Sequence, residues 1–162
     1  MASNRLSKAL DYLKFIPSSM RTAILSTTLG NIVPMVGTCG AEYLEITPNK
    51  VVVRIKNKRA VRNHIRGVHA CAMVLAAETA TGFAVGVNLP DDKLPLIKSM
   101  QIEFKKRASG DITATATLTD EQIAKIKTEP RGEVEVAVVM TDSEDKEPLE
   151  CKMLWAWVNK DK

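Results

Sequence analysis

The chain has 162 residues and a formal net charge of +4, and 45% of its residues are hydrophobic, which predicts one globular domain and excludes a disordered chain. Aromatic residues make up only 4%, which argues against a nucleic-acid reader built on stacked aromatic side chains, so no nucleic-acid partner is expected. No apolar run approaches the roughly 20 residues that cross a bilayer, so no membrane span is expected either.

The first 33 residues are expected to form a helical extension packed on the domain that follows, at 34–162. Leucines recur at helical spacing from Leu6 to Leu13, Ser3 can cap the start of a helix, and Pro17 ends it. The same segment is basic and rich in serine, which also loosely resembles a mitochondrial transit peptide.

Two strands and a long helix are predicted next. Residues 38–47 and 51–55 carry apolar and β-branched side chains, and the turn between them makes a hairpin. After a polar connection, residues 69–82 are apolar almost all round, which is typical of a buried helix. Gly82 is the expected C-cap of this helix.

The rest of the chain predicts four strands in meander order. Residues 99–107 alternate, with Met100, Ile102 and Phe104 on one face, and the other strands are expected at 112–118, 132–141 and 149–158. A short helix at 120–127 can be capped by Thr119 or Asp120. A sheet wrapped around a single apolar helix explains both the helix composition and the one-sided strands, and makes this an α+β domain.

Cys39, Cys71 and Cys151 are widely spaced and contain no CxxC pair. This argues against a disulfide framework and against a metal site, and it favours a reducing compartment. We therefore expect a cytoplasmic protein, with mitochondria as the alternative that the basic N-terminal segment suggests. Cys71 is interpreted as a small buried apolar residue rather than a nucleophile.

Residues 63–78 resemble the signature of hotdog-fold acyl-CoA thioesterases. That signature has an Asn, a His six residues later, a small residue directly after the His, and an acid near the middle of the central helix. Asn63, His69, Ala70 and Glu78 fill these places in order. The strand that leads to the Gly-Asp turn at 110–111 also resembles the family. The similarity is greatest to PaaI-like hotdog proteins, in a little-characterised subfamily with an N-terminal helical extension.

The resemblance implies a hotdog fold, in which an antiparallel sheet wraps around a long buried helix, and an acyl-thioester hydrolase without a cofactor. Ala70, at the start of the helix, is expected to offer its N–H to the thioester oxygen, and Glu78 to act as base or nucleophile with a pKa raised by burial. Eight residues separate the two, about 12 Å along one helix. Because one carbonyl cannot contact both, we expect a homodimer with composite sites, and the dimers can pair into a tetramer.

The other site residues are assigned supporting roles. Asn63 is expected to orient the attacking water or the Glu78 carboxylate, and His69 to fix the loop or polarise the thioester. The substrate is expected to be an acyl-coenzyme A or an acyl-carrier thioester. Its phosphates and arm are assigned to a set around the loop and the following strand: His64, Arg66, Gly67, Lys105 and Arg107.

Two other functions fit the same fold. Hotdog dehydratases that act on hydroxyacyl thioesters use a His with an acid fourteen residues later, and His64 and Glu78 have that separation. The second alternative is a non-catalytic hotdog protein that binds acyl-CoA or fatty acids. A carboxyl group of Glu78 bonded only to protein would favour binding, whereas an open tunnel that ends at Glu78 would favour catalysis.

Overall fold

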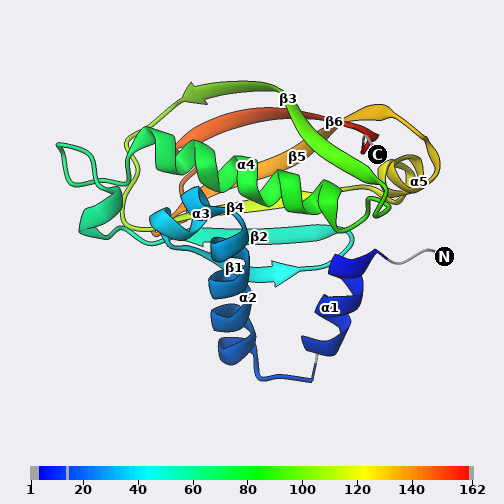
Figure 1. The fold of residues 1–162 in the computed structure, drawn as a ribbon. Coiled ribbons are helices and arrows are strands. Elements are labelled where there is room, and N and C mark those ends of the chain that lie inside the picture. Colours follow the sequence, from blue (N-terminus) through cyan, green and yellow to red (C-terminus); the bar gives the residue numbers. More distant parts are fainter. Residues whose placement is uncertain (1–3, 14, 161–162) are drawn as a thin grey trace.

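The computed structural model of the chain describes residues 4–13 and 15–160. Its frame is one antiparallel sheet of six strands in the order β1-β2-β4-β5-β6-β3. The sheet curves around the long helix α4 (Figure 1). The strands are β1 (Ala41–Ile46), β2 (Lys50–Ile55), β3 (Lys93–Phe104), β4 (Ile112–Thr117), β5 (Gly132–Asp142) and β6 (Leu149–Asn159).

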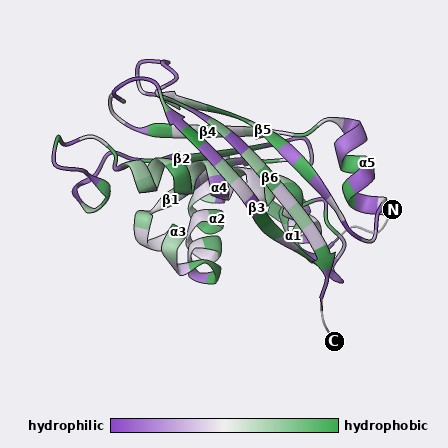
Figure 2. Ribbon diagram, turned by 90° about the horizontal axis from the view of Figure 1, so that it is seen from above, coloured by the Kyte–Doolittle hydropathy of each residue, from purple (hydrophilic) through white to green (hydrophobic). Residues whose placement is uncertain are grey.

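Helix α4 (Ala70–Gly86) fills the concave side of the sheet. Four of its alanines have no exposed surface, and their small side chains let the strands approach the helix closely: Ala76, Ala77, Ala80 and Ala84. The predicted α+β hotdog fold is therefore confirmed. One face of the sheet packs against this core. Figure 2 shows hydrophobic and hydrophilic residues alternating along β5, and Val134, Val136 and Met140 of this strand are buried.

The predicted end of the central helix at Gly82 is wrong, since α4 continues to Gly86 with Val87 as its C-cap. Gly82 serves packing instead. A Cβ at this position would lie 2.7 Å from Cη2 of Trp155, whose indole is buried against the helix. A glycine is therefore needed here for a close approach, not for a turn.

The predicted meander holds for β4, β5 and β6 but is wrong for β3, which pairs with β6 at the far edge of the sheet. This strand also begins at Lys93, six residues earlier than predicted. Pro95 lies within it, and an edge strand tolerates the missing N–H that a central strand does not. The inward face of β3 follows the prediction, because Met100, Ile102 and Phe104 are opposite inward-facing residues of β6.

In its described residues the N-terminal extension holds two helices rather than the single one expected, α1 (Arg5–Leu13) and α2 (Ser18–Ile32), and a third, α3 (Pro34–Cys39), opens the segment assigned to the domain. Pro17 is the N-cap of α2, and the predicted cap Ser3 lies outside the described residues. The first strand starts at Ala41, not at residue 38, because α3 ends at Cys39 and its C-cap Gly40 takes a left-handed φ of 61°.

The extension is tied to the domain at its start. The Asn4 side-chain amide donates to the carbonyl oxygens of Gly86 and Leu89, at 2.7 and 2.6 Å. The Arg5 N–H donates to the Asp91 carboxylate at 3.0 Å. From this anchor α1 and α2 project away from the sheet (Figure 1).

Two short helices complete the fold, η1 (Arg59–Val61) and α5 (Asp120–Thr128). The predicted cap of α5 is confirmed, because Thr119 and Gln122 form a reciprocal capping box. Among the described residues, no helix has the length and apolar character needed to cross a membrane.

Candidate active site

The N-terminus of α4 presents an unpaired backbone donor. His69 is the N-cap of the helix, and its Nδ1 accepts the Cys71 N–H at 3.1 Å. Because Nδ1 accepts, the neutral imidazole carries its own proton on Nε2. The Ala70 N–H has no acceptor within the described part of the chain, as is usual in the first turn of a helix, where such groups bind anions.

The Cys71 side chain is exposed in this first turn. The interpretation of Cys71 as a buried apolar residue is therefore wrong: the buried positions of the helix begin at Ala72, whereas Ala70 is half-buried and Cys71 is exposed. All three cysteines are free thiols.

Asn63 closes the loop that leads into α4. Its Oδ1 accepts the N–H groups of Ile65 and Gly67, at 3.1 and 3.0 Å, and its own N–H donates to the Gly67 carbonyl at 2.9 Å. Arg66 takes a left-handed φ of 64° to complete this turn. The Oδ1 atom is thus engaged by the loop, and Nδ2 is the group of Asn63 that remains to bind a ligand or water.

Glu78 lies in the middle of α4 and is half-buried. Its Oε2 accepts a long hydrogen bond of 3.4 Å from the Thr79 hydroxyl, and no cation of the described residues forms an ion pair with it. Burial raises the pKa of this carboxyl group, and the Thr79 hydrogen bond offsets only part of the effect. Such a carboxylate is a stronger base than a solvated one.

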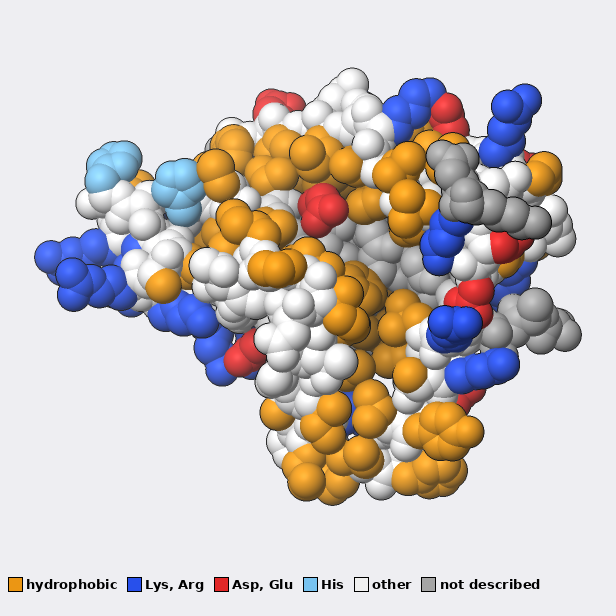
Figure 3. Space-filling model, in the orientation of Figure 1, with side chains coloured by type: hydrophobic (Ala, Val, Ile, Leu, Met, Phe, Trp, Pro, Cys, Tyr) orange, Lys and Arg blue, Asp and Glu red, His pale blue; other side chains and the backbone are white. Residues whose placement is uncertain are grey.

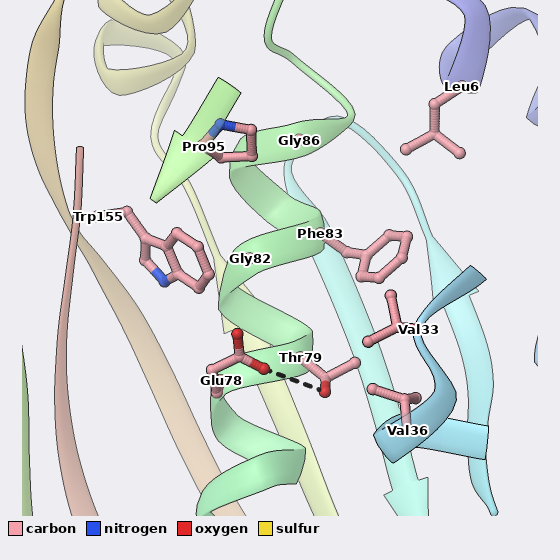
Figure 4. A pocket seen from close by; sticks show the side chains of 10 residues that line it. All are labelled: Leu6, Val33, Val36, Glu78, Thr79, Gly82, Phe83, Gly86, Pro95 and Trp155. Carbon is pink, nitrogen blue, oxygen red and sulfur yellow. Dashed lines mark hydrogen bonds between the residues drawn. The ribbon is translucent and has the colours of Figure 1, made fainter. Parts of the chain in front are cut away.

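The Glu78 carboxylate lines a pocket of about 330 Å³. Figure 4 shows it on α4 between the Trp155 indole on one side and Phe83, Val33 and Val36 on the other. The pocket is otherwise mostly apolar, and its remaining lining residues come from α1, α4 and β3: Leu6, Thr79, Gly82, Gly86 and Pro95. The space suits a hydrocarbon chain or another apolar group that ends at a carboxylate.

The predicted phosphate-binding residues lie at the same end of the molecule as the start of α4. Figure 3 shows the two histidines of the chain at this end, close to several Lys and Arg side chains. Arg107 donates to the Ile65 carbonyl at 3.2 Å, so it borders the loop of Asn63. Among the described residues neither Arg66 nor Arg107 forms an ion pair with an acid, which leaves both guanidinium groups with charge to offer an anion.

Lys105 is placed differently. Its Nζ lies 2.6 Å from Glu103 and 3.4 Å from Glu150, so two carboxylates already neutralise it. His64 is exposed on the loop and does not line the pocket that holds Glu78. The pair that the dehydratase alternative requires is therefore not brought together within one chain.

Within one chain, the structure gathers Asn63, Gly67, His69 and Ala70 at one end of α4 and places Glu78 about 12 Å further along the helix. Strand β3 pairs with β6 on one side, and its other edge pairs with no described strand. On its inward face, 47% of Met100 and 51% of Phe104 are exposed. A free strand edge that carries large hydrophobic side chains is suited to pairing with another chain.

Two residues carry no motif that the sequence could reveal: Trp155, which lines the pocket, and Tyr43, which packs against the lining residue Phe83. Tyr43 of β1 is completely buried, its ring packs edge-on against Phe83 at 4.9 Å, and its hydroxyl has no partner among the described residues. Burial, and to a lesser extent the charge of Glu78, raise the pKa of Tyr43. Trp155 donates from Nε1 to the Thr81 hydroxyl at 2.9 Å, which holds its ring as a wall of the pocket.

A family model described as "Domain of unknown function (DUF4442)" matches residues 21–158. No curated protein matches the chain. Similar solved structures include a Pseudomonas aeruginosa protein of unknown function, also named "Probable Thioesterase", with a TM-score of 0.76 and 23% identity. The match covers 86% of this chain and 96% of that one.

Two further solved structures carry thioesterase names. A thioesterase from Haemophilus influenzae has a TM-score of 0.66 at 16% identity, over 83% of this chain and 90% of its own. A thioesterase family protein from Silicibacter pomeroyi has a TM-score of 0.66 at 12% identity, over 86% of this chain and 99% of its own. At these identities the likeness shows a shared fold, which agrees with the resemblance seen in the sequence.

Proposed function

The chain belongs to the DUF4442 family and shares its fold with proteins named as thioesterases, and we propose that it hydrolyses acyl thioesters. The description of the family names no activity. The observation that carries the proposal is the Glu78 carboxylate, half-buried in an apolar pocket without a cationic partner among the described residues. A carboxylate kept in this state costs stability, and such costs are commonly retained at catalytic sites.

The proposed site is composite. Ala70 and Glu78 are too far apart on one helix to act on one carbonyl, so the Glu78 carboxylate of one subunit acts beside the Ala70 N–H of the other. The free edge of β3 and the exposed Met100 and Phe104 support a two-fold dimer in which two β3 strands pair and two α4 helices lie side by side. Pairing of two such dimers into a tetramer is part of the same proposal.

In the proposed reaction, the thioester oxygen accepts the Ala70 N–H, and the partial positive charge of the helix N-terminus stabilises the negative charge that develops there. Glu78 takes a proton from a water molecule, and the water oxygen forms a bond to the carbonyl carbon. The carbon–sulfur bond then breaks, and the leaving thiolate takes the proton from Glu78. The products are a carboxylic acid and a free thiol, and no cofactor takes part.

Asn63 and His69 act as positioning residues in this scheme. The Asn63 Nδ2 and His69 Nε2 groups are both donors directed away from the loop bonds that hold the two residues, and each can bind the water or the thioester. Arg66 and Arg107, with His64 and Gly67 beside them, receive the phosphates of coenzyme A or of a carrier arm. Lys105 contributes less to phosphate binding, because its ammonium group already forms ion pairs with Glu103 and Glu150.

The acyl chain is proposed to lie in the pocket beside Glu78, with Phe83 and Val33 among its contacts. This pocket also favours one alternative, a protein that binds acyl-CoA or fatty acids without hydrolysis. The compartment proposed is a reducing one, the cytoplasm or the mitochondrial matrix, which suits a chain with three free thiols.

Hydrolysis of a panel of short to long acyl-coenzyme A esters, followed by release of free thiol, tests the proposal. Glu78→Gln keeps the side-chain volume and removes the base, and should lower kcat/KM by about a hundredfold or more. Glu147→Gln makes the same change on an exposed turn and should have no effect. Binding of the esters without turnover would favour the carrier function, and equal turnover by Glu78→Gln would refute the role of Glu78.

A further inference from the structure

The free ends of α1 and α2 carry an exposed hydrophobic cluster, which we name the apolar tip. It consists of Tyr12, Phe15, Met20 and Ile24, with 81%, 93%, 57% and 40% of their surfaces exposed. Figure 3 shows hydrophobic side chains gathered at these helix ends, far from the sheet. Single exposed hydrophobic residues are ordinary, but a cluster on a projecting element is typical of a contact surface.

The cluster does not result from a helix that lacks a buried face. Leu10 and Leu13 of α1 pack against the core, as do Leu25 and Leu29 of α2. The extension therefore already buries one side of each helix in its own domain. The residues of the apolar tip lie on the remaining surface, and no contact within the described chain accounts for them.

The extension that carries the apolar tip has an excess of positive charge. Residues 1–33 hold four basic residues and one acid: Arg5, Lys8, Lys14, Arg21 and Asp11. Among the described residues neither Lys8 nor Arg21 forms an ion pair. Bulky apolar side chains flanked by Lys and Arg complement the surface of an anionic bilayer, where the apolar groups enter the interface and the cations meet lipid phosphates.

We propose that the apolar tip docks this protein on the surface of an anionic lipid bilayer. The helices are too short to span it and lie at the interface instead. A second copy of the chain is a poorer occupant, because two extensions of the same positive charge repel each other. Docking stands apart from the proposed hydrolysis, since no residue of the apolar tip lines the pocket with Glu78.

The position of the pocket agrees with docking through the apolar tip. Leu6 of α1 and Val33, at the end of α2, line it, so the two helices that carry the apolar tip also border the pocket. A bilayer at the tip would bring an apolar ligand that partitions into membranes close to the space beside Glu78.

Co-sedimentation of the full chain with lipid vesicles tests the proposal. Binding is expected to vesicles of phosphatidylcholine mixed with phosphatidylglycerol, to weaken with added salt, and to be much lower on phosphatidylcholine alone. The triple substitution Tyr12→Ser, Phe15→Ser and Met20→Ser should weaken it by about tenfold or more. Each unit of charge near an anionic surface changes binding about fivefold, so Lys8→Glu with Arg21→Glu, a change of four charge units, should weaken it by roughly several hundredfold.

A matched control removes exposed hydrophobic side chains from the sheet instead, by Leu44→Ser, Val139→Ser and Val158→Ser, and should bind like the natural chain. A reporter locates the contact. In Phe15→Trp the new indole should be quenched by brominated lipid, whereas the buried Trp155 and Trp157 should not.

Several outcomes would overturn the proposal. These are absence of binding to anionic vesicles, unchanged binding of the triple variant, or an unquenched indole at position 15 in bound protein. A fourth is a fall in oligomer mass on the triple substitution, measured by sedimentation velocity without lipid, which would assign the apolar tip to a contact between copies.

Discussion

The substitution Gly82→Ala should destabilise the protein, although it places the best helix former inside a helix. In an open position this change stabilises by roughly 0.5–1 kcal/mol. Here the new Cβ would lie 2.7 and 2.8 Å from Cη2 and Cζ2 of Trp155. The indole cannot retreat freely, because it is buried and its Nε1 donates to the Thr81 hydroxyl at 2.9 Å.

Overpacking of this kind costs about 1–3 kcal/mol, and a strained buried hydrogen bond adds about 1 kcal/mol. After the gain in helix propensity is subtracted, we expect a net loss of about 1–3 kcal/mol. Gly86→Ala is the matched control in the same helix, because a Cβ added there would meet no atom of the surrounding elements within 4 Å, and it should stabilise by up to about 1 kcal/mol.

Urea unfolding at a fixed protein concentration measures both changes in the free energy of unfolding. In thermal unfolding, Tm should move by about 2–4 °C for each kcal/mol. The expected result is opposite signs for the two variants. A Gly82→Ala protein as stable as the natural one, or more stable, would refute the close packing of Trp155 on α4.

Three further predictions concern stability, and urea unfolding measures each. Thr119→Ala removes the capping box of α5 and should cost about 1 kcal/mol, and a change below the error of the measurement would contradict the cap. Glu78→Gln should stabilise the protein at pH 7. Burial raises the pKa of Glu78, so the natural protein loses stability as pH rises through that raised value, whereas the glutamine variant does not. The difference should vanish in acid, where Glu78 is protonated. Tyr43→Phe should be neutral or stabilise by up to about 1 kcal/mol, since the hydroxyl is buried without a partner among the described residues, and a large loss would mean that it is bonded.

The sequence predicted the elements of the domain better than their arrangement. Hydrophobic alternation and β-branched composition together located five of the strands to within a few residues, because burial on one face leaves a period of two in the chain and branched side chains favour strands. The edge position of β3 was missed, since strand order depends on contacts far apart in sequence. Pro95 was the available signal, because a proline inside a strand favours an edge.

The N-terminal extension was predicted as one helix where the structure has α1 and α2, and α3, which follows it, was not predicted. Pro34 and Gly40 mark the start and end of α3 in the usual places for these two residues, at the first turn and after the last. The strand predicted at 38–47 overlapped only the last two residues of α3. Here packing of α3 on α2 outweighs local propensity.

Some residues of the candidate site could be predicted from the sequence, and others could not. Asn63, His69, Ala70 and Glu78 follow from a motif and lie where it implies, on the loop and on the central helix. Tyr43 and Trp155 could not be found, because each occupies an ordinary inward position of a strand. Trp155 lines the pocket, and Tyr43 packs against Phe83, which also lines it.

The composite site is the central claim, and two inactive variants in one dimer test it most directly. Ala70→Pro removes only the N–H, because Ala70 is the first helical residue, where proline is well accommodated, and His69 before it has the extended backbone (φ −64°, ψ 143°) that precedes proline. Glu78→Gln removes the carboxylate. Co-expression with two different tags allows the mixed dimer to be purified.

If Ala70 of one subunit works with Glu78 of the other, the mixed dimer holds one intact site and one site with both defects. Its thioesterase activity should then be about half that of the natural dimer, while each variant alone is inactive. A mixed dimer as inactive as its parents would contradict the composite site.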